Sequence, residues 1–279
     1  MTVKIITDSV ADLPPEIVKE LGITIIPINI CFGNEVYSDG IDITVEEFYQ
    51  RLERSKIMPT TAVPPLGVFA ETYDSVAEET DEILIITLSS KLSGFYSAAI
   101  QAIELMKKKR HIYVVDSRWV IMTEGFIVMS AARAAREGAS FGEVLEIVNR
   151  TMSRVQLCSV FDTLEYLKRG GRISKLAAFM GNMLNIHPIL GVKNGEVVSF
   201  GKKRSRAEAI NYLFNFAMSY STIDELSVAY YAAAQDAEDL IERLNVKFPR
   251  ERIYCSKTSP VIGTHTGPNL LVLAIMGDR

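Results

Sequence analysis

The chain has 279 residues, a mass of 31.0 kDa and a net charge of −4 at pH 7. This length predicts one large domain or two modest ones. Charged residues make up 23% and hydrophobic residues 48% of the chain, a balance that excludes intrinsic disorder. The weak acidic balance argues against a nucleic-acid binder or a protein of anionic membrane surfaces. The mean hydropathy of +0.15 indicates a high apolar content, but composition alone does not show where in the structure these apolar side chains lie.

No apolar run approaches the roughly 20 residues that a membrane-spanning helix needs. The run Leu270–Met276 is far too short, and the apolar stretch Trp119–Ala135 contains Glu124 and Arg133, which favours a buried helix. The first residues contain no basic leader, so we expect a cytoplasmic protein without stable membrane insertion.

The first half of the chain alternates strand-like and helix-like segments. Strands are predicted over residues 3–9, 23–32, 82–90 and 111–117. Helices are predicted over residues 14–22, 44–55, 65–79, 93–110 and 124–138. This alternation indicates an α/β fold in which helices flank a mostly parallel sheet.

The second half has a different pattern, typical of a mixed sheet with helices. Residues 154–174 combine a strand with a helix and a turn, and residues 187–205 predict a hairpin that turns at Asn194-Gly195. Further helices are predicted at Arg206–Ser219 and Asp236–Asn245, with strands over 225–233, 252–259 and 270–277. We place a boundary near residues 150–154, which divides the chain into an N-terminal α/β domain (1–152) and a C-terminal mixed α/β domain (153–279).

Small polar residues follow three of the predicted parallel strands, at Thr7-Asp8-Ser9, Ser89-Ser90 and Asp116-Ser117. Ligands of open α/β sheets bind outside the carboxyl ends of the strands. We therefore expect these residues to line one crevice. Asp8 and Asp116 could contact a ligand there, or they could cap helices and support the residues that do.

Ser93-Gly94 stands at the start of a predicted helix. A serine hydroxyl and the free N–H groups of a helix N-terminus can bind a carboxylate or a phosphate. Gly94 would let a ligand approach the backbone. An ordinary helix cap is the alternative interpretation.

His265 lies between glycines and a proline in the segment VIGTHTGPNL, which predicts a tight loop before the last strand. Its imidazole could hydrogen-bond an acidic group. Of the other two histidines, we expect His111 at the surface and His187 in a structural role.

Motifs of several enzyme classes are missing from the sequence. There is no GxSxG, P-loop, GxGxxG or HExxH motif. No cluster of acidic residues and histidines has the spacing of metal ligands, so we expect no metal or cofactor. The three cysteines are far apart and predict reduced thiols: Cys31, Cys158 and Cys255.

Two basic segments stand out against the negative net charge. One contains Lys168, Arg169 and Arg172, and the other spans residues 202–206 with Arg204 at its centre. They are either solvated turns or a docking face for an acidic partner. The methionine-containing segment Leu176–Ile186 is either core or the lining of a tunnel for a flexible ligand.

An ordered set of segments resembles the DegV family of bacterial fatty-acid-binding proteins. The segments are, in chain order, ITDSVADLP, YSDGIDIT, PTTAVPP, SSKLSGFYSAA, VVDSR, TLEYLKRGGRIS, NIHPILGVKNG and VIGTHTGPN. The resemblance runs from about residue 4 to the end of the chain. It implies a DegV-like two-domain α/β fold.

The resemblance also implies a function. A long-chain fatty acid would lie in an internal apolar tunnel, and its carboxylate would be presented to the catalytic subunit of a fatty acid kinase. The acyl phosphate formed in this way enters phospholipid synthesis. The chain would then be a monomeric lipid carrier without an ATP site of its own. The alternative is a small-molecule hydrolase or transferase that uses Ser93 and His265.

The positions that match the family motifs imply a role for each site residue. By resemblance, Thr61, Ser93 and His265 hold the carboxylate and Gly94 keeps the backbone open, with Ser9, Asp116 and Thr266 in support. Arg172 and Arg204 match the region of kinase docking. The chain departs from the family pattern at four positions, which leaves the choice of acyl chain open: Ala62, Val63, Phe95 and Asn269. We expect the first three to make the rim of the pocket more apolar.

Overall fold

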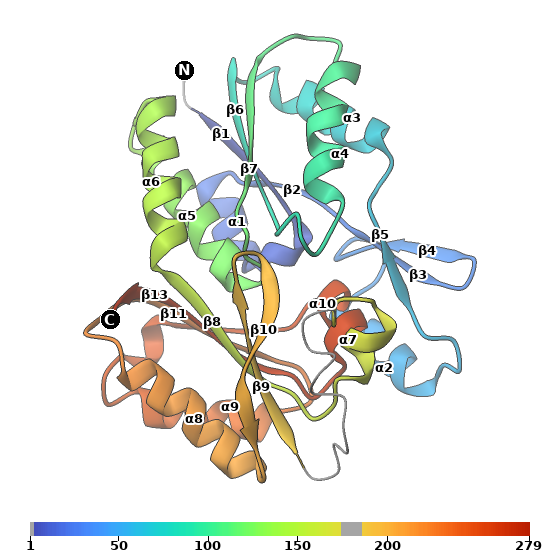
Figure 1. Ribbon diagram of the computed structural model, residues 1–279. Helices are drawn as coiled ribbons and strands as arrows, with labels where there is room; N and C mark the ends of the chain where they lie inside the picture. The colour runs from blue at the N-terminus through green and yellow to red at the C-terminus, as the bar shows by residue number, and fades with distance from the viewer. Residues whose placement is uncertain (1–2, 174–185) are drawn as a thin grey trace.

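The computed structural model describes residues 3–173 and 186–279 (Figure 1). Its N-terminal half contains a parallel sheet of order β2-β1-β6-β7, formed by Thr24–Ile26, Lys4–Asp8, Glu82–Thr87 and His111–Asp116. Helices α3 (Leu66–Val76) and α4 (Phe95–Ala102) lie on one side of this sheet. On the other side are α1 (Pro15–Leu21), α5 (Met122–Arg136) and α6 (Phe141–Arg154). The predicted parallel α/β half is confirmed.

The C-terminal half is built on a six-stranded mixed sheet of order β10-β9-β8-β13-β11-β12. The strands are, in that order, Glu196–Lys203, His187–Lys193, Val155–Val160, Leu271–Asp278, Thr222–Tyr230 and Ile253–Lys257. Only β11 and β12 are parallel to each other among its pairs of described strands. Helices α8 (Arg206–Met218) and α9 (Ala234–Leu244) pack on one face over a second, separate hydrophobic core. The predicted mixed sheet and its hairpin turn at Asn194-Gly195 are confirmed.

A small antiparallel sheet that the sequence pattern did not predict has the order β4-β3-β5. Its strands are Glu35–Ser38, Asn29–Phe32 and Thr60–Ala62. The single strand predicted over residues 23–32 is wrong, because β2 and β3 belong to different sheets with Pro27 between them. Proline has no N–H to continue a sheet ladder, so the chain changes partner there. In the new sheet Thr61 lies opposite Ile30.

Two predicted segments near the site differ from the structure. Helix α4 ends at Ala102 and continues as the 3-10 helix η2 (Ile103–Leu105), so the helix predicted over 93–110 is too long. The loop predicted around His265 is a short helix, α10 (Pro260–Thr266). Proline suits the first turn of a helix, where its missing N–H would have no partner. The remaining helices of the described residues are α2 (Val45–Arg54), α7 (Glu165–Arg169), η1 (Ser9–Ala11) and η4 (Arg250–Arg252).

The proposed boundary after residue 152 falls in the last turn of α6. This helix ends at Arg154, and β8 of the other sheet begins at Val155. The chain changes from one sheet to the other at this point, and the division into two domains stays a prediction. Residues 176–185 of the predicted core or tunnel segment lie outside the described residues.

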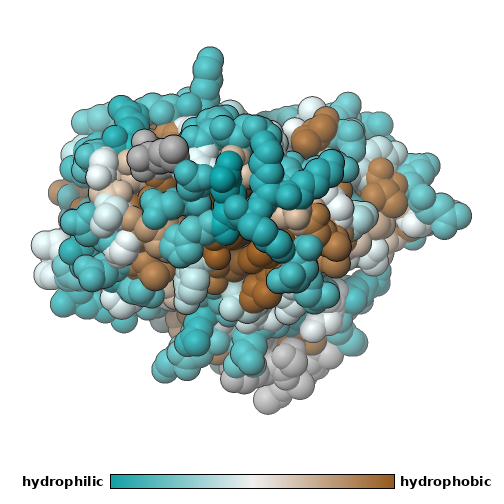
Figure 2. All heavy atoms as spheres, turned by 90° about the horizontal axis from the view of Figure 1, so that it is seen from above, coloured by the Kyte–Doolittle hydropathy of each residue, from teal (hydrophilic) through white to brown (hydrophobic). Residues whose placement is uncertain are grey.

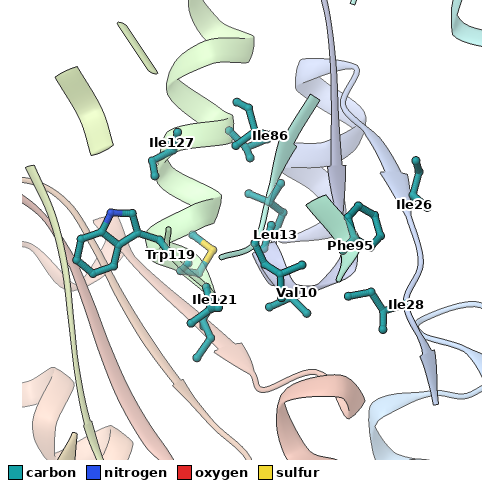
Figure 3. Close-up of a cluster of buried hydrophobic side chains, with 14 of the residues drawn as sticks. Val10, Leu13, Ile26, Ile28, Ile86, Phe95, Trp119, Ile121 and Ile127 are labelled. Carbon is teal, nitrogen blue, oxygen red and sulfur yellow. The ribbon is translucent and has the colours of Figure 1, made fainter. Parts of the chain in front are cut away.

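The main hydrophobic core continues from one half of the chain into the other. It contains side chains of the parallel sheet and its helices together with Leu157, Leu190 and Val272 of the mixed sheet. Figure 3 shows part of it, where Trp119 and Ile121 lie on the side nearer the mixed sheet. On the face seen from the N-terminal end of the molecule, hydrophilic side chains dominate and hydrophobic ones form small groups (Figure 2). None of the helices among the described residues is long and apolar enough to cross a membrane.

Carboxyl groups buried in the N-terminal half include those of Asp8, Asp12, Asp39 and Glu124. Burial raises the pKa of Asp12 to about 8 and that of Asp39 to about 7, and hydrogen-bonding groups of Ser259 oppose the shift at Asp12. Burial also raises the pKa of Asp8, to about 6. These carboxyl groups lose water and gain no cationic partner among the described residues, so burial favours their neutral form.

The titration of Asp12 predicts a loss of stability in alkali. Its folded-state pKa lies above its unfolded value of 3.8, so its stabilising contribution is full below pH 3.8 and is lost as the pH rises through about 8. We expect Asp12→Asn to raise the free energy of unfolding at about pH 9 by at least about 1 kcal/mol relative to wild type, and by less near pH 5. Urea denaturation across this range measures the difference. The exposed control Asp239→Asn should follow wild type, and parallel curves for wild type and Asp12→Asn would contradict the assignment.

Candidate functional site

A largely apolar pocket lies between the parallel sheet and the mixed sheet. One wall comes from the N-terminal half and includes Val10, Ile28, Leu88, Val120 and Ile121. The opposite wall comes from the mixed sheet and its connections and includes Leu157, Phe161, Leu190, Val192, Val197 and Val272. Because both halves supply a wall, the pocket exists only when they are packed together.

The polar side chains of the pocket include two that meet from distant parts of the chain. Thr61 is on β5 and His265 is on α10, and the Thr61 Oγ1 and the His265 Nε2 are 2.8 Å apart. The small unpredicted sheet is therefore what brings Thr61 to the histidine. The resemblance paired these residues, and the structure places them in hydrogen-bond contact.

Ser93 and Gly94 line the same pocket, at the end of the loop that joins β6 to α4. The Ser93 Oγ accepts a hydrogen bond from the Phe95 N–H at 3.2 Å, while Gly94 rather than Ser93 occupies the cap position of α4. A Cβ atom on Gly94 would stand 3.8 Å from Val63, an ordinary contact. Packing alone does not require glycine at this position. Its lack of a side chain would instead let a ligand come close to the backbone.

His265 is uncharged at neutral pH. Burial, with a smaller effect of the Arg172 charge, lowers its pKa from 6.5 to about 4. Its Nδ1 is buried and has no hydrogen-bond partner among the described residues. Gly170 packs flat against the ring, since a Cβ atom there would lie 2.2 Å from Nδ1. A larger residue at 170 would push the imidazole out of place.

Arg172 lies in the pocket with these residues and is about half buried. It donates to the carbonyl oxygens of Leu92, from Nε at 3.1 Å, and of Gly170. No carboxylate among the described residues pairs with it, and burial lowers its pKa. A guanidinium that loses water without an anionic partner is costly, so this end of the pocket favours an anion.

The polar residues predicted to line a crevice at the strand ends do not line this pocket, and that expectation is wrong. Two of them, Asp8 and Asp116, hold the loop before Ser93 instead. Asp8 accepts from the Leu88 N–H at 2.7 Å, and Asp116 accepts from the Ser90 N–H at 3.1 Å and from its hydroxyl at 2.5 Å. Backbone amides of a loop need partners once they are buried, and carboxylates at strand ends supply them here.

The two remaining residues expected to act in support take different places. Ser9 lies outside the pocket, and its Oγ accepts from the Ile28 N–H at 3.2 Å. Thr266 does line the pocket, and its hydroxyl donates to the Ile262 carbonyl within α10 at 2.9 Å.

Of the four positions that depart from the family pattern, two line the pocket and two do not. Ala62 and Val63 line the pocket with apolar atoms as expected. Phe95 does not, because it is fully buried in the core. Its ring centroid lies 4.7 Å from that of Phe69 with the two ring planes tilted by 55°, so its expected place on the rim is wrong. Asn269 lies outside the pocket, where its carbonyl accepts from Arg206 at 3.1 Å.

The basic residues predicted for docking lie in different environments. Arg204 is exposed, whereas Arg206 is held in ion pairs with Asp162 and Asp236. Arg172 is in the pocket with the predicted carboxylate ligands. Sequence reasoning missed this position and the contact of Gly170 with His265. The Gly170-Gly171 pair was the one visible signal, since paired glycines often mark a close approach.

The chain is similar to known proteins over nearly its whole length. The model of the DegV family, described as "Uncharacterised protein, DegV family", matches residues 2–278. A DegV domain-containing protein of Caldanaerobacter subterraneus is 35% identical over 271 residues, which cover 96% of each chain. A fatty-acid-binding DegV family protein from Thermus thermophilus is 30% identical, with a TM-score of 0.89 over 99% of this chain and 100% of that one.

DegV of Bacillus subtilis, whose crystal structure is described as that of a fatty-acid-binding protein, is 29% identical. It matches with a TM-score of 0.90 over the full length of both chains. The family match extends over nearly the whole chain, and the fold is shared from end to end. The chain therefore belongs to the DegV family.

Proposed function

We propose that this protein binds a long-chain fatty acid in the pocket between its two sheets and presents the carboxylate to a partner kinase. The observation that carries the first part is the asymmetry of the pocket. Its walls are apolar, while Arg172, His265, Thr61 and Ser93 stand together among its lining residues. Arg172 is the one charged side chain among the described lining residues. Related DegV proteins are described as fatty-acid binders.

The energetics suit a ligand with one anionic end and a long apolar tail. Each CH₂ group that leaves water contributes about 0.8 kcal/mol, so the tail supplies affinity without specific contacts. The carboxylate would need several hydrogen bonds to replace its water. The Ser93 hydroxyl, the one donor that the Thr61–His265 pair has left and the Arg172 guanidinium can supply them. The guanidinium would also gain the anionic partner that it lacks among the described residues.

The alternative of a hydrolase or transferase receives no support from the geometry. A nucleophilic serine needs a base within hydrogen-bond reach and a third group that orients this base. No hydrogen bond joins Ser93 to His265 in the part of the chain described, and the His265 Nδ1 has no carboxylate to orient it there. His265 is instead engaged with Thr61.

The proposed kinase step rests on two observations: the sequence has no P-loop, and Arg204 is exposed. The sequence has no P-loop, and in our proposal ATP is bound by the partner. Arg204 is exposed, and no ion pair is formed by its side chain in the structure described, so it is free to meet an acidic surface. In the same proposal the chain is a cytoplasmic monomer, and the acyl phosphate serves phospholipid synthesis.

Fatty-acid binding is tested on the purified protein. We expect organic extraction and mass spectrometry to recover a long-chain fatty acid from it, because the buried tail slows dissociation. Stripped protein should take up stearate or oleate in a calorimetric titration. If no acyl chain is recovered and the titration gives no signal, the proposal is refuted.

The carboxylate contacts are tested by comparing an acid with an alcohol of the same chain length. We expect Arg172→Gln and Thr61→Val each to weaken binding of the acid by about tenfold or more, since each removes a hydrogen bond to a charged group. Binding of the fatty alcohol should change much less, because its tail contacts are unaltered. Arg204→Gln is the matched control and should bind the acid like wild type. Equal losses for acid and alcohol would show that these residues act on the pocket as a whole.

Presentation to a kinase is tested by reconstitution with the catalytic subunit of a fatty acid kinase and ATP. We expect an acyl phosphate, trapped by hydroxylamine, only when both proteins are present. Arg204→Glu should lower its rate of formation at least tenfold without a change in fatty-acid affinity, because charge reversal repels an acidic docking surface. Acyl phosphate from this chain and ATP alone would contradict the assignment of the carrier role.

A further inference from the structure

The turn of the β9–β10 hairpin reaches across to the loop that carries Ser93. The hydroxyl of Ser89 in this loop donates to the carbonyl of Gly195 in the turn, with an Oγ to O distance of 2.7 Å. Ser89 is fully buried, and Gly195 is buried as well. The contact joins residues that are 106 positions apart in the chain. It therefore ties the C-terminal half to one edge of the pocket.

Ser89 is also the organising residue of the loop. Its carbonyl accepts from the N–H groups of Leu92 at 3.0 Å and Ser93 at 3.2 Å. Its Oγ accepts from the Lys91 N–H at 3.2 Å, and its own N–H donates to the carbonyl of Trp119 at 2.9 Å. Any displacement of Ser89 is thus passed directly to the backbone of Ser93, because two hydrogen bonds of the loop end on its carbonyl.

The turn fits against Ser89 only because residue 195 is glycine. Its φ angle is +83°, a conformation that other residues rarely adopt. A Cβ atom on Gly195 would lie 2.6 Å from the Ser89 Oγ and 3.2 Å from the Lys91 side chain. Even a methyl group would therefore force the turn and the loop apart.

A second contact from the C-terminal half reaches the same loop. Arg172 donates from Nε to the Leu92 carbonyl at 3.1 Å, three residues along from Ser89. The loop 88–94 is thereby held by the hairpin turn at one point and by a pocket residue at another. Both contacts break if the two halves move apart.

We propose that Ser89 and Gly195 form a latch that positions the Ser93 loop and keeps the pocket closed around its ligand. Ser89 and Gly195 are positioning residues, since neither lines the pocket. The latch sets how fast a bound acyl chain leaves, because its release lets the Ser93 edge separate from the mixed sheet. The identity of the ligand rests on the proposed function, whereas the ordering of the loop does not.

The test compares two glycine substitutions with similar backbone strain. Gly195→Ala breaks the latch, whereas Gly138→Ala, at a φ angle of +91° with no atom within 4 Å of the added Cβ, is the matched control. We expect Gly195→Ala to speed amide hydrogen exchange at Leu92 and Ser93, and to raise the dissociation rate of a fluorescent fatty-acid analogue about tenfold, as loss of one hydrogen bond predicts. Gly138→Ala should leave both close to wild type.

Ser89→Ala provides a second route if Gly195→Ala does not fold. It should produce the same changes, and the double variant should add little to either single one, because both remove the same contact. Equal exchange at Leu92 and Ser93 in the Gly195 and Gly138 variants, or fully additive effects in the double variant, would overturn the latch. If wild type does not take up the analogue, the proposed function fails, while hydrogen exchange still decides on the latch.

Discussion

The hydrogen bond between Thr61 and His265 joins residues 204 positions apart and marks the place where the pocket becomes polar. It forms only if the small sheet places β5, which carries Thr61, on the N-terminal side of the pocket and α10 places His265 on the opposite side. Burial then keeps the imidazole uncharged by lowering its pKa to about 4. A neutral ring beside the charged Arg172 avoids the repulsion that a second cation would bring.

That arrangement leaves a single positive charge at the polar end of an apolar space. The Arg172 guanidinium donates hydrogen bonds to two backbone carbonyl oxygens. These neutral partners use some of its N–H groups but do not balance its positive charge. A bound carboxylate would balance this charge and would also accept a hydrogen bond from the Ser93 hydroxyl, whose Oγ accepts from the Phe95 N–H. In the function proposed above, an anionic group would complete the polar end of the site, and the apolar walls would contact the rest of the ligand.

The high hydrophobic content of the chain has a corresponding explanation. Part of it forms two cores, one of which continues across both halves, and part of it lines the pocket between the sheets. The carboxylates at the strand ends serve a different purpose. Asp8 and Asp116 hold the backbone of the loop before Ser93, so the polar strand ends of the parallel sheet shape the pocket without facing it.

The sequence by itself determined the alternating α/β half, the mixed second half and the hairpin at Asn194-Gly195, because these follow from local periodicity and turn chemistry. The ordered family segments also predicted that Thr61, Ser93 and His265 act together, and the structure places all three along one pocket. Only the tertiary structure decided that residues 23–32 divide between two sheets, that Phe95 turns into the core, and that Arg172 enters the pocket. These outcomes depend on contacts between residues far apart in the chain, and no local pattern of apolar and polar residues records which distant neighbour a side chain will meet.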